Sequence, residues 1–284
     1  MLKKLNIVVS KYNSCNKLIE HLSSIYDIKV LTTPEEIDSC EKIDIVLFSD
    51  NRNLSLDLLN PMKKNHSIKY CNSSSYEKDK YEINLFKQLK YNKDILYIGI
   101  NTGALLLHYL SGGRIINQIT GHNDTSHEIT IEDNKKNNNR YEIPNVSRLE
   151  FDIYNRLHDR VQRGLILRTN DLDFYTRIKE KLNAKPILEE TLIGESNHEQ
   201  MIYLDTLNPE VFKLIGHSTF FMSDKYFISE YDNDYSIINK KFLEPEIVYY
   251  KNTNSLVFQS NPFSKNSSTS YLNESINLIK SYIK

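Results

Sequence analysis

The sequence predicts an α/β fold, with a mainly parallel central sheet that helices cover on both faces. Short, continuous apolar segments alternate with amphipathic helical segments over residues 1–110, which is the pattern of a parallel sheet buried between helices. After Pro209, apolar residues alternate at a period of two, and this adds an antiparallel extension. A chain of 284 residues is long enough to bury one large core of this kind.

Strands and helices are expected to alternate in the first part of the chain. The strands are the apolar segments Leu5–Val9, Ile28–Leu31, Ile43–Phe48 and Ile95–Ile100. The helices carry apolar residues at helical spacing and span Asn16–Tyr26, Pro34–Cys40, Asp79–Leu89 and Asn101–Leu110. Thr33 is a suitable N-cap for the second helix, and Gly112-Gly113 is a suitable end for the fourth.

The remainder predicts a single domain over residues 1–284 that carries an inserted helical segment at about 135–190. The tract Asp133–Arg140 is polar and of low complexity, which predicts a solvated loop. Within the insertion, helices are expected at Leu149–Leu157 and Asp171–Leu182, with a strand at Gly164–Arg168 between them. The antiparallel strands and the last helix are expected at Phe212–Ile215, Tyr226–Ile228, Ile247–Tyr250, Ser255–Gln259 and Tyr271–Ile283.

Composition and charge exclude several classes of function. The chain has 36 Lys and Arg residues against 37 Asp and Glu residues, so no global field attracts nucleic acid or an anionic membrane. Its three cysteines, Cys15, Cys40 and Cys71, have no C-x-x-C spacing, which favours a reducing cytoplasm over a disulfide framework. No segment approaches the roughly 18 apolar residues of a membrane span. We therefore expect a cytoplasmic protein with neither nucleic acid nor a membrane as its partner.

The most informative segment is the apolar strand that runs into a helix through Gly99-Ile-Asn101-Thr-Gly103. A turn with glycine on both sides of a central residue is typical of a nucleophile elbow, because the backbone is strained and flanking Cβ atoms would clash. The first amides of the helix can then stabilise a bound oxyanion. We expect Asn101 to lie at such a bend.

On this segment the chain resembles the class I glutamine amidotransferases, and within them the γ-glutamyl hydrolase (C26 peptidase) branch, whose elbow usually reads G-I-C-R-G-x-Q-L-L-N. The resemblance implies a flavodoxin-like three-layer sandwich. Further segments match family motifs in the same order along the chain, and the insertion falls outside them: Phe48–Leu54, Asp79–Glu82, Ser111–Ile115, Gln118-Ile119, Gly121-His122, His127, Ser196–Met201, Glu244–Glu246 and Val257–Phe263.

The resemblance also implies that the family's catalytic chemistry is missing. In the family, a cysteine thiolate attacks a γ-glutamyl amide, a histidine shuttles the proton and a glutamate orients that histidine. Asn101, Asn261 and Phe263 stand at these three positions. A carboxamide is not a nucleophile near pH 7, and neither Asn nor Phe can replace imidazole or carboxylate in the relay.

We therefore predict a degenerate glutamine amidotransferase-like protein, a pseudoenzyme that binds a partner protein or a small amine or amide ligand. The resemblance implies a synthetase-type enzyme or a second copy of the chain (a homodimer) as the partner. The pocket is expected at the carboxyl ends of the parallel strands. Its candidate residues are Asp50, Asn51, Asn53, Gly99, Thr102, Gly103, His122, His198, Gln200 and Gln259.

Three other interpretations stay open at this point. A rebuilt active site could use Thr102 as nucleophile with His198 or His122 as base. His122, His127 and His198 could gather around a metal with Asp124 or Glu128, but their spacing is not that of a compact metal motif, so neither a metal nor a cofactor is expected. Finally, an interaction protein could use the basic residues of the insertion, Arg156, Arg160, Arg163 and Arg168.

Overall fold

The computed structural model describes most of the chain, and the statements below concern that part alone. The described residues are 2–12, 16–50, 53–55, 75–119, 122, 125–132, 153, 156–157, 160, 167–183, 192–219, 222–223, 226–229, 235–238 and 243–283. The chain divides into two compact units. The first consists of Met1–Glu132 and Leu192–Lys284, and the second is Asp133–Thr191.

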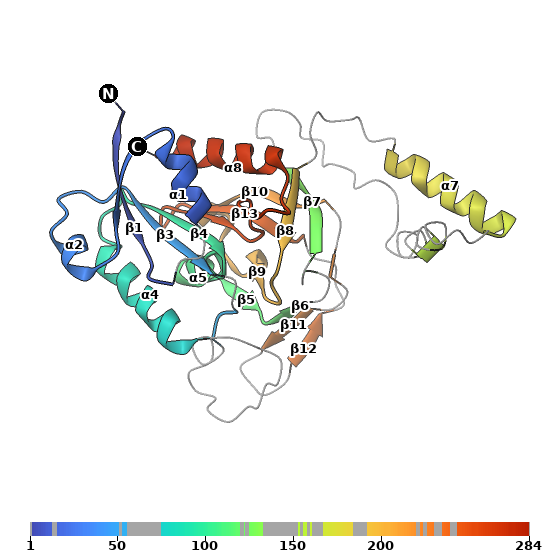
Figure 1. Ribbon diagram of the computed structural model, residues 1–284. Helices are drawn as coiled ribbons and strands as arrows, with labels where there is room; N and C mark the ends of the chain where they lie inside the picture. The colour runs from blue at the N-terminus through green and yellow to red at the C-terminus, as the bar shows by residue number, and fades with distance from the viewer. Residues whose placement is uncertain are drawn as a thin grey trace. The chain divides into compact units, whose positions relative to one another are not determined.

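The first unit is built on a nine-stranded mixed sheet (Figure 1). Five neighbouring strands are parallel, and the other four continue the sheet in antiparallel pairs. The predicted α/β fold with a parallel sheet and an antiparallel extension is therefore confirmed. In order across the sheet, the strands are β2 (Asp27–Leu31), β1 (Lys4–Val9), β3 (Ile45–Asp50), β4 (Leu96–Asn101), β14 (Ser255–Phe258), β13 (Pro245–Tyr250), β10 (Phe212–Ser218), β7 (Thr125–Ile131) and β8 (Leu192–Ser196).

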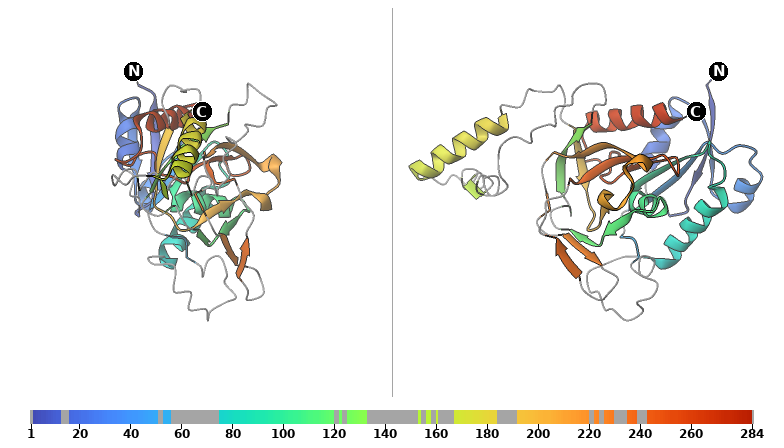
Figure 2. Two further views of the ribbon diagram at one scale, coloured as in Figure 1. Left: turned by 90° about the vertical axis from the view of Figure 1, so that its right-hand side faces the viewer. Right: turned by 180° about the vertical axis from the view of Figure 1, so that it is seen from behind.

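Helices cover both faces of this sheet, so the core has two layers (Figures 1 and 2). On one face, α1 (Asn16–Ser23) and α8 (Thr269–Tyr282) bury Leu18, Leu22 and Ile279 against the strands. The other face is covered by α2 (Pro34–Asp38), α4 (Tyr76–Leu89) and α5 (Thr102–Leu110). Strands such as β3 and β4 are buried along their whole length, which explains their continuous apolar sequence.

Local sequence explains where several helices begin. Thr33 forms a capping box with Glu36 at the start of α2, as expected from its position. Ser75 and Ser268 accept hydrogen bonds from the third backbone N–H of α4 and α8. The chain leaves α5 through Ser111 and Gly112, whose φ of 95° favours glycine.

Short strands complete the first unit. β5 (Arg114–Ile116) pairs with β9 (Met201–Tyr203), and β6 (Gln118–Ile119) pairs with the hairpin of β11 (Tyr226–Ser229) and β12 (Tyr235–Ile238). Two 3₁₀ turns, Leu204–Thr206 and Pro209–Val211, lead into β10. In the second unit, α7 (Thr169–Asn183) lies where the sequence predicts a helix.

Some predictions fall outside the described residues, and some strands were not predicted. The loop Asp133–Arg140 and most of Leu149–Leu157 and Gly164–Arg168 are not described. Sequence periodicity missed the short or half-buried strands β5, β6, β7, β8, β9 and β12. Among the described helices, none combines the length and apolar character that crossing a bilayer requires.

Candidate functional site

The bend predicted at Asn101 is present between β4 and α5. Asn101 ends β4 with φ 53° and ψ −115°, and Thr102 begins the helix directly. Only Asn101 and Asn254 have a positive φ among the described residues other than glycine. With a ψ of −115° this backbone lies outside the left-handed helical region and is strained in any residue except glycine, so the elbow geometry coexists with a side chain that cannot act as nucleophile.

The two glycines of the turn are required by close backbone contacts. A Cβ atom on Gly99 would lie 2.5 Å from the carbonyl oxygen of Gly103. A Cβ atom on Gly103 would lie 2.0 Å from the carbonyl oxygen of Phe48 on β3. Real Cβ atoms do not approach backbone so closely, and neither carbonyl can move without shifting a strand or the helix. The close packing of α5 against the sheet therefore explains both glycines of the G-x-N-x-G pattern.

Four segments that the sequence assigns to one pocket are joined in the structure. Asp50 is the register partner of Asn101 across β3 and β4. The side chain of Gln200 bonds both backbone groups of Leu54, at 2.7 and 3.1 Å, and Asn53 donates to Glu199. Gln259, which follows β14, accepts from the Ile202 backbone N–H and has its Nε2 3.5 Å from Nε2 of His198. Asn51, which is also a candidate pocket residue, lies outside the described residues.

Asn261 and Phe263, which the sequence resemblance assigns to a histidine and a glutamate position, have structural partners. Asn261 accepts a hydrogen bond from the Phe263 backbone N–H, and its own N–H donates to the Glu195 carbonyl. Phe263 is buried in the apolar cluster that includes residues of α8. Neither side chain offers an acid or a base, so the environment of both is that of a packed turn.

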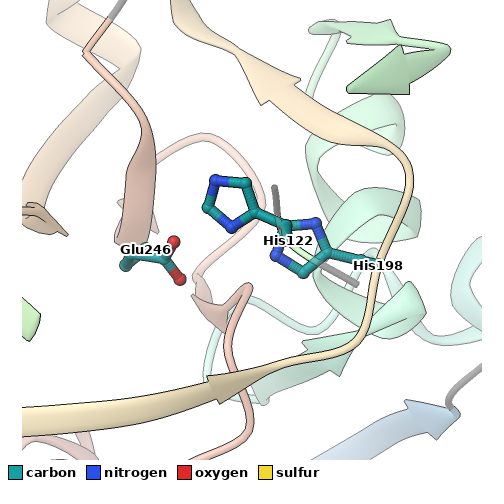
Figure 3. Close-up of side chains that lie close together, drawn as sticks. All are labelled: His122, His198 and Glu246. Atoms are coloured by element: carbon teal, nitrogen blue, oxygen red, sulfur yellow. The ribbon is translucent and has the colours of Figure 1, made fainter. Parts of the chain in front are cut away.

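A second group of buried polar residues joins the three histidines that the sequence analysis considered together to two glutamates that it did not place with them. It contains three histidines and two glutamates from four separate parts of the chain. They are His122, His127 on β7, His198, Glu244 directly before β13, and Glu246 on β13. The rings of His122 and His198 stack with centroids 4.8 Å apart, and His127 meets His122 edge-on at 5.0 Å. Figure 3 shows the Glu246 carboxylate facing these two stacked imidazoles.

Each imidazole is oriented by a partner on one nitrogen. His122 Nε2 lies 3.1 Å from a Glu244 oxygen, and His127 Nε2 lies 2.8 Å from a Glu246 oxygen. His198 Nδ1 lies 2.9 Å from the Gln200 carbonyl oxygen. A carbonyl can only accept, so Nδ1 of His198 carries the proton, and the lone pair of Nε2 accepts the 3.5 Å contact from Gln259 Nε2.

The burial of this cluster shifts the pKa values of its members in different directions. Burial lowers the pKa of His198 to about 3, and the adjacent His122 adds to this effect. Burial alone would raise the pKa of Glu246, but the charge of His127 and its hydrogen bond outweigh burial and hold that pKa at about 2. In return, Glu246 raises the pKa of His127 despite the cost of burial. For Glu244, the hydrogen bond from His122 outweighs burial and lowers the pKa.

The donor atoms of His122, His198 and Glu246 lie within 4.8 Å of one another, and all three residues are buried. Sequence spacing did not indicate this group, because its members lie far apart in the chain. The acidic partners considered from sequence were Asp124, which is not described, and Glu128; the structure places Glu246 and Glu244 there instead. The signal that could have identified the two glutamates is Glu244-Pro245-Glu246 at the start of an apolar strand. Residues two apart lie on one face of a strand, so this pattern predicts two carboxylates on the same side of the sheet.

Comparison with known proteins gives similarity only at the level of solved structures. No protein-family model matches this chain, and no curated protein matches its sequence. A protein assigned as a GMP synthase component from Thermoplasma acidophilum is 11% identical with a TM-score of 0.48, over 99% of this chain and 96% of that chain. A glutamine amidotransferase from Thermotoga maritima is 10% identical with a TM-score of 0.44, over 98% of this chain and 83% of that chain.

A third solved structure, PurLQS from Thermotoga maritima, is 10% identical with a TM-score of 0.41 over the full length of both chains. All three TM-scores are below 0.5. Similarity of this degree does not bear on the activity, substrate or partner of this chain.

Proposed function

We propose that this chain is a glutamine amidotransferase-like protein that does not hydrolyse γ-glutamyl amides and instead binds a small amine or amide ligand or a partner protein. One observation carries the proposal: the strained bend between β4 and α5 has a carboxamide, Asn101, at its centre. A bend of this kind holds the attacking group in hydrolases, and a carboxamide has no nucleophilic lone pair to offer near pH 7.

The residues assigned to the relay agree with this proposal. Asn261 and Phe263 provide neither a proton acceptor near neutral pH nor a carboxylate. Removal of single members of a nucleophile relay typically costs several orders of magnitude in rate. With no member left at the assigned positions, catalysis by the family mechanism is not expected.

Ligand binding is supported by the polar side chains that gather at the carboxyl ends of β3, β4 and β14. Gln200 and Gln259 are fully buried, and Asn53 is nearly so. Gln200 and Gln259 bond the backbone of Leu54 and Ile202; because carboxamides both donate and accept hydrogen bonds, a ligand with an amine or amide group would bind by taking over such bonds. A synthetase-type partner, a second copy of the chain and a cytoplasmic location follow from the sequence resemblance and composition alone, and they stay predictions.

Two observations weigh against the alternative of a rebuilt active site that uses Thr102 and His198. Among the described residues, no hydrogen bond joins the Thr102 hydroxyl to an imidazole. His198 Nδ1 is held by the Gln200 carbonyl, and burial lowers the pKa of His198 to about 3. A general base works best with a pKa near the operating pH, and His198 is far from that range.

The proposal is tested with purified chain and two classes of substrate, glutamine and γ-glutamyl amines, by continuous measurement of glutamate release. We expect no release above the protein-free rate from the natural chain. Release that Thr102→Ala or His198→Gln abolishes, and that the control His21→Gln at an exposed position of α1 leaves intact, would establish the rebuilt active site instead. Binding of the same compounds by the inactive chain is measured by isothermal titration, and heat from at least one of them is expected.

A further inference from the structure

We infer that His122, His198 and Glu246 form a binding site for one divalent transition-metal ion of the zinc class. The three residues offer two imidazole nitrogens and a carboxylate oxygen within 4.8 Å of one another, and all three side chains are buried (Figure 3). This inference does not depend on the proposed function, because none of its ligands belongs to the elbow or to the assigned relay.

An unsatisfied nitrogen at the centre of the cluster points to a missing partner. His122 has no exposed surface, and its Nδ1 has no hydrogen-bond partner among the described residues. The other nitrogen of this ring lies 3.1 Å from Glu244, so Nε2 carries the proton and Nδ1 keeps its lone pair. Buried polar atoms are nearly always satisfied, and a metal ion would satisfy this one.

The surroundings of the three ligands resemble the outer shell of a metal site. Metal-bound histidines usually donate their second N–H to a carboxylate or a backbone carbonyl. His122 does so to Glu244 and His198 to the Gln200 carbonyl. Glu244 is itself held by the N–H groups of Met222 and Ser223, and Glu246 by that of Ser260.

A comparison with His108 shows that burial alone does not produce this arrangement. His108 is also fully buried, but its Nδ1 lies 2.7 Å from the Tyr250 hydroxyl and its Nε2 lies 2.7 Å from the Arg114 carbonyl. Both of its nitrogens are therefore satisfied by protein. In contrast, Nδ1 of His122 has no partner among the described residues, and Nε2 of His198 has the 3.5 Å contact with Gln259 Nε2.

The donor set selects the class of metal. Two imidazole nitrogens and one carboxylate favour zinc and related transition metals, whereas calcium and magnesium prefer oxygen ligands. In a tetrahedral zinc site with bonds of about 2.1 Å, neighbouring donor atoms lie about 3.4 Å apart. Side-chain rotations that move the donor atoms by roughly 1 Å would bring the three of them to this spacing.

The metal alone is the probe. Chelator-treated, dialysed chain is titrated with Zn²⁺ by calorimetry, and bound metal is counted by mass spectrometry after gel filtration. We expect one zinc ion per chain. His198→Gln should lose most of this binding, Glu244→Gln should weaken it about 10- to 100-fold, and His21→Gln, at an exposed position of α1, should bind as the natural chain does.

Two outcomes would overturn the inference. In the first, the natural chain retains no zinc; in the second, His122→Gln and His198→Gln bind zinc as tightly as the natural chain does. If these variants do not fold, the natural chain decides the question. Crystals soaked with zinc should then show anomalous scattering between His122, His198 and Glu246. A strong zinc peak elsewhere, with none between these side chains, would contradict the site.

Discussion

Asn101 holds a backbone conformation that costs free energy in any residue except glycine. Its φ of 53° and ψ of −115° are imposed by the direct connection of β4 to α5, with no loop between them. Glycine and alanine both remove the side chain at this position, but only glycine adopts the conformation without strain.

We therefore expect Asn101→Gly to be more stable than Asn101→Ala, by about 1–2 kcal/mol. Urea unfolding of both variants measures the difference, and the comparison cancels the contacts that the asparagine side chain makes. Equal stability of the two variants would mean that the bend relaxes and is not imposed by its surroundings.

Gly103 is fixed by its contact with the strand beside it. Because an added Cβ would lie 2.0 Å from the Phe48 carbonyl, Gly103→Ala should cost about 3 kcal/mol or more of the free energy of unfolding. Gly216→Ala is the control, since its nearest atoms are side-chain ends at 3.2 Å, and a smaller loss is expected there. A loss in Gly103→Ala no larger than in the control would disprove the close packing of α5 on β3.

His108 predicts how stability depends on pH. Burial lowers the pKa of His108 from 6.5 to about 4, so the folded state binds fewer protons than the unfolded state between these values. The contribution of His108 is complete above pH 6.5 and is lost as the pH falls towards 4, by about 3 kcal/mol. In His108→Gln, the loss of unfolding free energy between pH 6.5 and 4 should be smaller by this amount. The exposed control His21→Gln should follow the natural chain, and parallel curves for His108→Gln and the natural chain would contradict the prediction.

At the scale of elements, α4 is anchored to the parallel sheet by a buried lysine. Lys78 Nζ lies 3.0 Å from Asp50 at the end of β3 and 3.7 Å from Glu82 one turn further along α4. Ser10 donates to Glu82, and the Ser55 N–H donates to Asp79. Burial raises the pKa values of Asp79 and Glu82, so the lysine charge offsets the cost of burying these carboxylates.

Lys78→Met should cost about 3–5 kcal/mol of unfolding free energy, because it leaves buried carboxylates without their cation. Chemical denaturation at pH 7 measures this loss. Lys80→Met removes a lysine from the exposed side of the same helix, and a change within about 0.5 kcal/mol is expected. Similar losses in both variants would show that the ion pairs at Lys78 do not stabilise the docking of α4.

The elements that sequence patterns predicted are those whose environment is simple. β1, β3 and β4 are buried on both faces, so their apolar segments are continuous, and the glycines of the elbow have a steric cause that needs no knowledge of distant residues. β7 and β8 are only half-buried, and the second unit separates these paired strands in the sequence, so no local pattern marks them. The glutamate partners of the three histidines were missed for the same reason, because the sheet and the loops beside it bring them together from distant parts of the chain.

At the scale of the whole molecule, two polar centres lie on different parts of one sheet. The elbow and Asp50 belong to the parallel strands β4 and β3, whereas His127 and Glu246 belong to the antiparallel strands β7 and β13. Gln259 lies beyond β14, between these two sets of strands, and contacts His198. The sheet therefore carries a buried, ordered polar region apart from the bend at Asn101.

The central claim is that the elbow survives without its reaction, and a single-turnover measurement tests it most directly. Purified chain in stoichiometric excess is incubated with isotope-labelled glutamine or a γ-glutamyl amine, and labelled glutamate is quantified by mass spectrometry. We expect the compound to be recovered intact, at the level of a protein-free sample. Stoichiometric formation of labelled glutamate that Thr102→Ala or His198→Gln prevents would contradict it.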